Sequence, residues 1–172
     1  LLRHDTDAFN RWEAAQQLFP RAILGALNAP ESAHLSADLI ETLERILLDA
    51  HLSSSYKTQL LSLPNFATLA QKVQHTQALD PQKLFAARKA VGNALVHSLG
   101  YYWSDTYVQL NDGAAYRYDG ESAGKRSLKN LALAYWAKSR ERKGDAWRAV
   151  RNQYQNSDNM TDRIAALNIA IE

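Results

Sequence analysis

Apolar residues recur at intervals of three and four along nearly the whole chain, and this period constrains the fold more than any other feature. Such spacing places side chains on one face of an α-helix, whereas a β-strand needs alternation at every second residue. No stretch alternates in that way with β-branched residues. We therefore predict an all-α fold of about seven or eight antiparallel helices, stacked in pairs as an irregular, armadillo- or HEAT-like α-solenoid.

Residues that start or interrupt helices divide the first half of the chain. A helix is expected over about 7–27, and Pro20 is expected to kink it or split it into two, because proline lacks the N–H that a helix interior uses. A second helix is expected over about 36–48. Two short helical pieces follow, one ending before Pro64 and one beginning after it.

The longest helical pattern begins at an Asp-Pro pair. Asp80 is expected to be the N-cap and Pro81 the first helical residue, where a missing N–H costs nothing. Gly100 is expected to mark a bend in this element. The segment 111–125 then holds two Asp-Gly pairs, which are typical of turns, and is the one clear loop that the sequence predicts.

The last part of the chain shows three further helical patterns. The first follows the loop and is expected to end in a tight break at Gly144, and Asp145 is expected to cap the second. Asn159 is expected to cap the third, with Asp162 three residues later as a short acidic partner in a capping box.

The net charge of +2 is unevenly distributed. Residues 1–120 hold 10 Lys/Arg and 12 Asp/Glu, a balance of −2, whereas residues 121–172 hold 10 and 6, a balance of +4. Most of the excess lies in 125–151, where nine basic residues face only Glu141 and Asp145. Such a patch could meet phosphates or an acidic partner. The favoured interpretation is a solvated helix face, because apolar residues at core spacing separate the charges.

The sequence lacks the common signatures of catalytic and metal sites. It has no cysteine, no HExxH, no GxSxG and no Gly-rich phosphate loop. His97 is expected at a partly buried, hydrogen-bonded edge of the core. The other histidines are expected at the surface or at an interface, and they are His4, His34, His51 and His75. We therefore predict no catalytic, cofactor-binding or metal-binding residue in this chain.

Three pairs of nearby acidic residues invite a general acid and base interpretation. Their positions at helix starts or on polar faces favour capping and solvation instead. The pairs are Asp5/Asp7, Glu41/Glu44 and Asp158/Asp162.

Aromatic residues are numerous and mostly at helical spacing, so we expect them in the core and between helices. A surface that stacks nucleic-acid bases would need exposed rings interleaved with Lys or Arg. Only Tyr116, Arg117 and Tyr118 in the loop offer that arrangement. The tryptophans and tyrosines considered are Trp12, Tyr101, Tyr102, Trp103, Tyr107, Tyr116, Tyr118, Tyr135, Trp136, Trp147 and Tyr154.

Three stretches carry a resemblance to a known family. They are "LLRHDTDAFNRWEAAQ" at 1–16, "GKRSLKNLALAYWA" at 124–137 and "NMTDRIAAL" at 159–167, with "LDPQKLFAARKAV" consistent between them. Together and in this order they resemble the C-terminal all-helical domain of bacterial aminopeptidase N, the alanyl aminopeptidase family of zinc metallopeptidases. The resemblance spans essentially all of residues 1–172.

The resemblance implies a non-catalytic role for this domain. Members of the family remove N-terminal residues from peptides, using a zinc ion held by an HExxH helix upstream of this domain, and further helices follow it. None of their zinc ligands or catalytic glutamates has a counterpart here, so zinc is implied for the intact protein only. We expect residues 1–172 to be one helical unit, an internal slice of the C-terminal domain that lacks the catalytic domain. Its implied partner is the catalytic domain of the same polypeptide, in the bacterial cytoplasm, where it would enclose the chamber that admits peptide substrates.

Two hypotheses from different classes remain at this point. The first is a non-catalytic helical cap of a zinc aminopeptidase. The alternative is a free-standing helical-repeat scaffold that binds an acidic partner or nucleic acid through Lys125–Arg151. No run of apolar residues is long enough to span a membrane.

A segment of a larger domain is expected to expose the apolar faces that neighbouring helices would otherwise cover. We expect the first and last helices to be only partly buried, and a crystal or dimer mate to cover them. The residues concerned are Leu1, Leu2, Ile164, Leu167 and Ile171.

Overall fold

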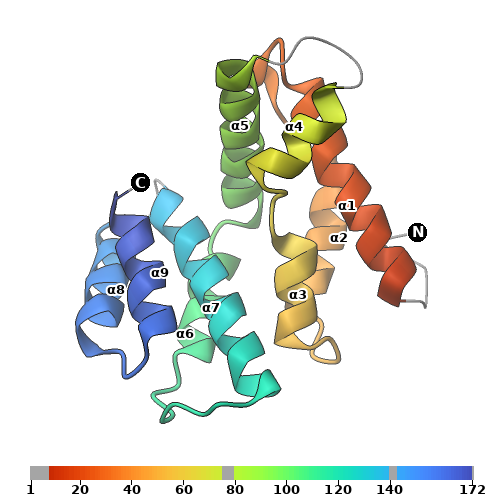
Figure 1. Cartoon of the computed structure of the whole chain (residues 1–172). Coiled ribbons are helices and arrows are strands. Elements are labelled where there is room, and N and C mark those ends of the chain that lie inside the picture. The colour runs from red at the N-terminus through yellow and green to blue at the C-terminus, as the bar shows by residue number, and fades with distance from the viewer. Residues whose placement is uncertain (1–7, 75–79, 140–142, 172) are drawn as a thin grey trace. The chain divides into compact units, whose positions relative to one another are not determined.

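The described part of the chain is built of helices and loops. The computed structural model describes residues 8–74, 80–139 and 143–171, and no strand occurs among them. They form nine α-helices (Figure 1), which are α1 Ala8–Gly25, α2 Ala37–Leu48, α3 Ser54–Leu61, α4 Phe66–Gln74, α5 Pro81–Leu99, α6 Tyr102–Leu110, α7 Gly120–Lys138, α8 Lys143–Asn156 and α9 Met160–Ile171. A single 3₁₀ turn, η1, spans Pro30–Ser32. The predicted all-α class is confirmed, with one helix more than the upper expected number.

The additional helix arises at Gly100. This residue has a backbone φ of 42°, in the left-handed region that favours glycine. The chain therefore leaves α5 at Leu99 and starts again as α6 at Tyr102. The expected bend is confirmed, and it separates two helices.

The sequence predicted the starts of two other helices correctly. The Asp80 carboxylate accepts hydrogen bonds from the backbone N–H groups of Gln82 and Lys83, at 2.9 and 3.3 Å, so Asp80 is the N-cap of α5. The backbone N–H of Thr68 likewise donates to Asn65 at the start of α4.

Other local expectations differ from the structure. Helix α1 runs through Pro20 as one element, so the expected split into two helices was wrong. The neighbours Phe19 and Ile23 are buried, and their packing stabilises a turn that proline weakens. The second Asp-Gly pair is no turn, because Asp119 is the N-cap of α7 and accepts a hydrogen bond from the Ser122 N–H. Asp145 lies inside the first turn of α8, which already begins at Lys143.

The chain divides into two units. The first comprises residues 1–48 and 60–98, the second 49–59 and 99–172, and the boundary passes through α3. In the first unit, the Arg88 side chain on α5 donates to the Pro64 carbonyl oxygen at 2.8 Å and ties down the connection between α3 and α4. The fully buried aliphatic side chains of this unit include Ile23, Leu43, Ile46, Leu60, Leu61, Leu69, Leu84 and Leu95.

Helix α7 is the centre of the second unit, since it packs against α6, α8 and α9. Aromatic pairs join it to α6. The ring centroids of Trp103 and Tyr135 lie 4.5 Å apart, and those of Tyr107 and Trp136 lie 5.8 Å apart. All four side chains are buried, which confirms the predicted packing role of these aromatic residues.

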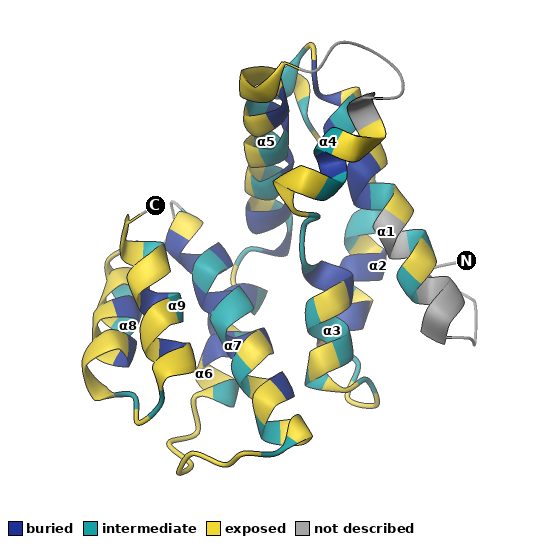
Figure 2. Ribbon diagram, viewed as in Figure 1, coloured by how far each residue is buried: buried dark blue, intermediate teal, exposed yellow. Residues whose placement is uncertain are grey.

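The outer surface of α8 and α9 remains largely exposed (Figure 2). Ile164, Leu167 and Ile171 are all exposed, as predicted, whereas Leu1 and Leu2 lie outside the described residues. Trp147 and Tyr154 on α8 and Met160 on α9 are exposed as well. None of the described helices combines the length and the hydrophobicity needed to cross a bilayer.

Two glycines on α7 provide a matched test of packing in the second unit. A Cβ atom at Gly124 would lie 3.0 Å from the Ser55 backbone nitrogen, whereas a Cβ atom at Gly120 would meet nothing within 4 Å. We expect Gly124→Ala to be less stable than Gly120→Ala by about 1–3 kcal/mol, the usual cost of overpacking. Urea unfolding of both variants measures this difference, and equal stabilities would contradict the close contact between α3 and α7.

Candidate functional site

A buried ion pair joins α7 to α9. The Lys129 ammonium nitrogen lies 2.6 Å from Asp162 Oδ2, and the two side chains are only 10% and 3% exposed. Charges removed from water in this way cost several kcal/mol each unless they are paired and hydrogen-bonded. The expectation of solvation was therefore wrong for both residues, because tertiary packing brings two segments more than thirty residues apart together.

Hydrogen bonds satisfy the Asp162 carboxylate from several sides. Its Oδ1 accepts from Asn130 Nδ2 at 2.9 Å, and its Oδ2 also accepts from Asn159 Nδ2 at 3.2 Å. The Asp162 backbone N–H donates to Asn159 Oδ1 at 2.9 Å, which confirms Asn159 as the N-cap of α9. Asp162 thus both completes the cap and receives the buried charge of Lys129.

Helix α8 enters the same network through Gln153, which is buried. Its Nε2 donates to Asn130 Oδ1 at 2.8 Å and to the Asp162 carbonyl oxygen at 3.0 Å. Its Oε1 has no hydrogen-bond partner among the described residues. The network therefore holds three helices together and leaves one buried acceptor unused.

A cavity of about 350 Å³ opens above this network. Its walls come from the loop 110–117, from α7, from α8 and from the turn that leads into α9. Lys129, Gln153 and Asp162 contribute to the lining, so the buried polar groups border the cavity. The cavity is therefore lined by both basic and acidic side chains.

The loop over the cavity is fastened at two points. The Tyr116 backbone N–H donates to Asp158 Oδ2 at 2.8 Å, and Arg126 Nη1 donates to the Arg117 carbonyl oxygen at 3.1 Å. The Arg126 guanidinium also lies 4.6 Å from the centre of the Tyr116 ring. The Asn159 side chain and then the Tyr116 N–H hold the pKa of Asp158 below its usual value.

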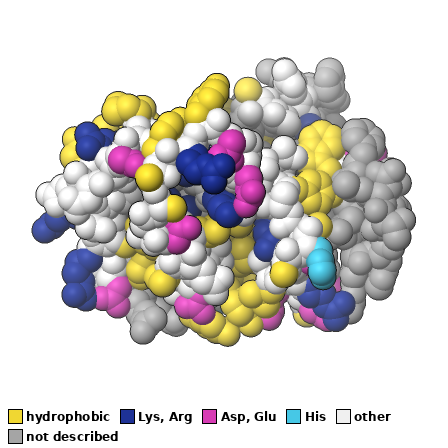
Figure 3. All heavy atoms as spheres, turned by 90° about the horizontal axis from the view of Figure 1, so that it is seen from below, with side chains coloured by type: hydrophobic (Ala, Val, Ile, Leu, Met, Phe, Trp, Pro, Cys, Tyr) yellow, Lys and Arg dark blue, Asp and Glu magenta, His cyan; other side chains and the backbone are white. Residues whose placement is uncertain are grey.

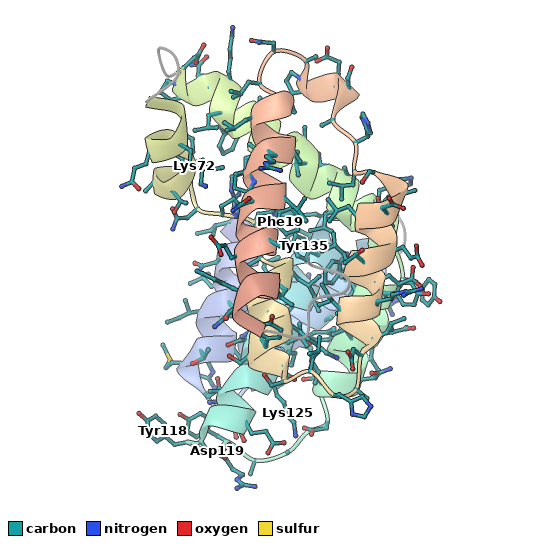
Figure 4. The ribbon with its side chains drawn as sticks, turned by 90° about the vertical axis from the view of Figure 1, so that its right-hand side faces the viewer. Phe19, Lys72, Tyr118, Asp119, Lys125 and Tyr135 are labelled. Carbon is teal, nitrogen blue, oxygen red and sulfur yellow. The ribbon has the colours of Figure 1, made fainter. Side chains whose placement is uncertain are left out.

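These contacts weaken the interpretation of the loop as a base-stacking surface. The face of Tyr116 is engaged by Arg126, and Arg117 pairs with Asp119 at 3.2 Å. Tyr118 is 95% exposed and projects away from α7, as Figure 4 shows together with Asp119 and Lys125.

Three basic residues of the segment 125–151 are paired with acidic side chains. Lys129 pairs with Asp162, Lys125 with Glu121 at 2.8 Å, and Arg148 with Asp145. Bonding to Glu121 raises the pKa of Lys125, and the Ser122 backbone N–H lowers that of Asp119. On the face of the molecule drawn in Figure 3, Lys and Arg side chains lie beside Asp and Glu side chains.

The remaining candidate residues do not form a common site in the described part of the chain. His34, His51 and His97 are exposed, and His4 and His75 lie outside the described residues. The expectation of a partly buried His97 was wrong, because its neighbours Leu95, Val96 and Leu99 take the buried positions of α5. No group of three or more His, Cys, Asp or Glu side chains that could hold a metal ion occurs within 8–74, 80–139 and 143–171.

Comparison with known proteins identifies the family. Residues 1–172 match the family described as "Domain of unknown function (DUF3458_C) ARM repeats". The chain belongs to this family. ARM repeats are stacked helical units, which agrees with the predicted class and with the helices observed.

Relatives of the DUF3458_C chain are bacterial aminopeptidases. It is 28% identical to aminopeptidase N of Escherichia coli (strain K12) and 27% identical to that of Haemophilus influenzae, each over 99% of this chain and 19% of the relative. It is 30% identical to aminopeptidase N of Caulobacter vibrioides over 97% of this chain and 19% of the relative. The chain thus spans about a fifth of the curated relatives it matches, and the recognised resemblance is confirmed.

A solved structure shares the fold. Legionella pneumophila aminopeptidase A, crystallised in complex with aspartic acid, superposes with a TM-score of 0.82 at 23% identity, over 99% of this chain and 20% of that one. The similarity shows that the helical arrangement of this chain occurs as part of a larger aminopeptidase.

The buried ion pair between Lys129 and Asp162 leads to a quantitative prediction. Asp162→Asn would leave the Lys129 ammonium buried without its counter-charge, and we expect a loss of about 3–5 kcal/mol in the free energy of unfolding. Glu121→Gln is the control, because it breaks the exposed pair with Lys125 and should cost less than about 1 kcal/mol. Urea titrations followed by circular dichroism measure both. Equal effects would mean that the α7–α9 pair is not buried in solution.

Proposed function

We propose that this chain is a non-catalytic helical cap of a bacterial zinc aminopeptidase. In the intact protein it would form a wall of the active-site chamber and restrict access to short or unfolded peptides. The observation that carries the proposal is the match of the whole chain to about a fifth of each aminopeptidase N relative. The helical-repeat family and the shared fold with part of a larger aminopeptidase agree with it.

The donor chemistry of the chain supports a role without zinc. Zinc sites use three or four Cys, His, Asp or Glu ligands, and the described residues bring no such group together. The acidic pair Asp158/Asp162 already has other partners, since Asp162 bonds Lys129 and Asn130, and Asp158 bonds Tyr116 and Asn159. We further propose that the zinc ion and the catalytic groups of the intact enzyme belong to another part of the polypeptide, and that this chain supplies no catalytic, cofactor-binding or metal-binding residue.

The proposed partner is the catalytic domain of the same polypeptide, together with neighbouring helices. The exposed apolar surface of α8 and α9 supports this, because large apolar patches on a folded domain mark interaction surfaces. Its members are Trp147, Tyr154, Met160, Ile164, Leu167 and Ile171. We further propose the bacterial cytoplasm as its compartment. The alternative, a free-standing scaffold that binds an acidic partner or nucleic acid through 125–151, has less support, because Lys125, Lys129 and Arg148 are already paired with acids.

The first test is enzymatic. The purified chain should not hydrolyse alanine or leucine p-nitroanilide above the blank at any zinc concentration, because no ligand set for the metal comes together among its described residues. The intact aminopeptidase serves as the positive control. Zinc-dependent turnover by residues 1–172 alone would overturn the assignment as a non-catalytic cap.

The second test concerns the exposed face of α9. Ile164 is 47% exposed in this chain, so Ile164→Asp should change the unfolding free energy of the isolated chain by no more than about 0.5 kcal/mol. In the intact aminopeptidase the same change should lower the thermal midpoint, because it would place a charge in a buried contact. Asn168→Asp, an exposed polar position on the same helix, is the matched control. An unchanged midpoint in the intact protein would contradict the proposed contact face.

A further inference from the structure

Two Asp-Gly pairs lie close together in the sequence, and the fold gives them different surroundings. We propose that Asp112–Gly113 is a site of spontaneous covalent modification, at which Asp112 isomerises to isoaspartate, whereas hydrogen bonds of the folded chain protect Asp119–Gly120 from the same reaction. This inference goes beyond the cap function, which gives neither pair a role. It rests on the exposure and the hydrogen bonding of the two pairs.

The reaction uses only the atoms of the pair and water. The Gly113 backbone nitrogen attacks Asp112 Cγ, a C–N bond forms, and the hydroxyl of the protonated carboxyl group leaves as water with the proton of the nitrogen. The product is a succinimide ring. Water then opens the ring: attack at Cγ restores aspartate, whereas attack at the main-chain carbonyl carbon of Asp112 gives isoaspartate, in which the main chain runs through the side chain. Glycine favours the first step because no Cβ shields its nitrogen.

Asp112 and Gly113 are open to solvent. Residues 111–118 are all exposed and form neither helix nor strand. Gly113 has a backbone φ of 71°, in the left-handed region that favours glycine, and a Cβ atom built on it would meet nothing within 4 Å. Water therefore reaches the pair, and no neighbouring atom crowds the position where the ring would close.

The peptide group between Asp112 and Gly113 is free to turn. Ring closure requires this group to rotate until its nitrogen faces Cγ. Among the described residues, neither the Asp112 carbonyl oxygen nor the Gly113 N–H takes part in a hydrogen bond. The Asp112 side chain accepts from the Ala114 backbone N–H at 2.9 Å, at an exposed position. Losing one exposed hydrogen bond costs little, because water replaces it.

Hydrogen bonds hold the second pair at both the side chain and the main chain. The Asp119 carboxylate accepts from the Ser122 backbone N–H at 2.8 Å and from Ser122 Oγ at 3.0 Å, and it pairs with Arg117 at 3.2 Å. The Asp119 carbonyl oxygen accepts from the Ala123 N–H at 2.9 Å, so the peptide group between Asp119 and Gly120 belongs to the first turn of α7. Ring closure there would have to break the N-cap and the first helical hydrogen bond together.

Crowding at the glycine does not distinguish the two pairs. A Cβ atom at Gly120 would meet nothing within 4 Å, as at Gly113. The Ser122 backbone N–H, and then the Ser122 hydroxyl, lower the pKa of Asp119, which keeps its carboxyl group in the charged form that is the poorer electrophile. The difference in reactivity therefore arises from hydrogen bonding in the folded chain, and it should vanish when the chain unfolds.

The test compares the two pairs within one sample. The 172-residue chain is kept at neutral pH for several weeks, one portion folded and one unfolded in guanidinium chloride. Trypsin then releases residues 90–117 and 118–125, which carry the two pairs separately, and electron-transfer mass spectrometry quantifies isoaspartate in each. In the folded chain we expect isoaspartate to form at least about tenfold faster at Asp112 than at Asp119, which corresponds to about 1.4 kcal/mol in activation free energy.

The unfolded portion is the control for the role of the fold. There both pairs lose their hydrogen bonds, and the two rates should become similar. Equal rates in the folded chain, or no isoaspartate at Asp112, would overturn the proposal. A tenfold difference that persists in guanidinium chloride would also overturn it, because the difference would then come from the local sequence.

Two variants make the test specific. Gly113→Ala places a Cβ atom beside the attacking nitrogen and should slow isomerisation at Asp112 without changing Asp119. Ser122→Ala removes one partner of the Asp119 carboxylate and should speed isomerisation at Asp119 about threefold, the effect of one weak hydrogen bond. Ser127→Ala removes an exposed hydroxyl elsewhere on α7 and is the matched control, which should change neither rate. An unchanged rate at Asp112 in Gly113→Ala, or at Asp119 in Ser122→Ala, would contradict the proposal, while the hydrolysis assay judges the cap function separately.

Discussion

The ion pair between Lys129 and Asp162 is the interaction on which the second unit depends most. It removes two opposite charges from water and holds α7 against α9 at 2.6 Å. Its desolvation cost is offset only because Asn130 and Asn159 also bond the carboxylate. A pair that requires several partners at once tolerates only one relative placement of its helices, so it specifies the arrangement more than it adds stability.

The same network explains why α7 is the central helix. Helix α7 meets α6 through Trp103–Tyr135 and Tyr107–Trp136, and it carries Lys129 and Asn130 toward α8 and α9. The two sets of contacts are linked by electrostatics. Burial, and then the nearby Asp162 carboxylate, raises the pKa of Tyr107 to about 12, so its hydroxyl stays protonated at neutral pH. Aromatic packing and polar pairing therefore act together on one helix.

The exposed apolar residues and the polar cavity lie in different parts of the second unit. The apolar residues on α8 and α9 are exposed, whereas the cavity under the loop 110–117 is lined mainly by polar side chains. Exposed apolar surface of this kind is typical of contacts with other polypeptide segments.

Much of the fold could be predicted from the amino-acid sequence alone. The all-α class, the N-caps Asp80 and Asn159, the bend at Gly100 and the aminopeptidase resemblance all follow from local signals or short stretches, because helix period and capping act over a few residues. The candidate site could not be predicted in this way. In the sequence, Lys129 is indistinguishable from a basic residue on a solvated helix, and its role follows only from the contact with Asp162 on α9. Gln153 is likewise indistinguishable from an exposed polar residue, and its role follows from the hydrogen bond that it donates to Asn130. Burial and pairing between segments decide those roles, and they exist only once the helices have packed.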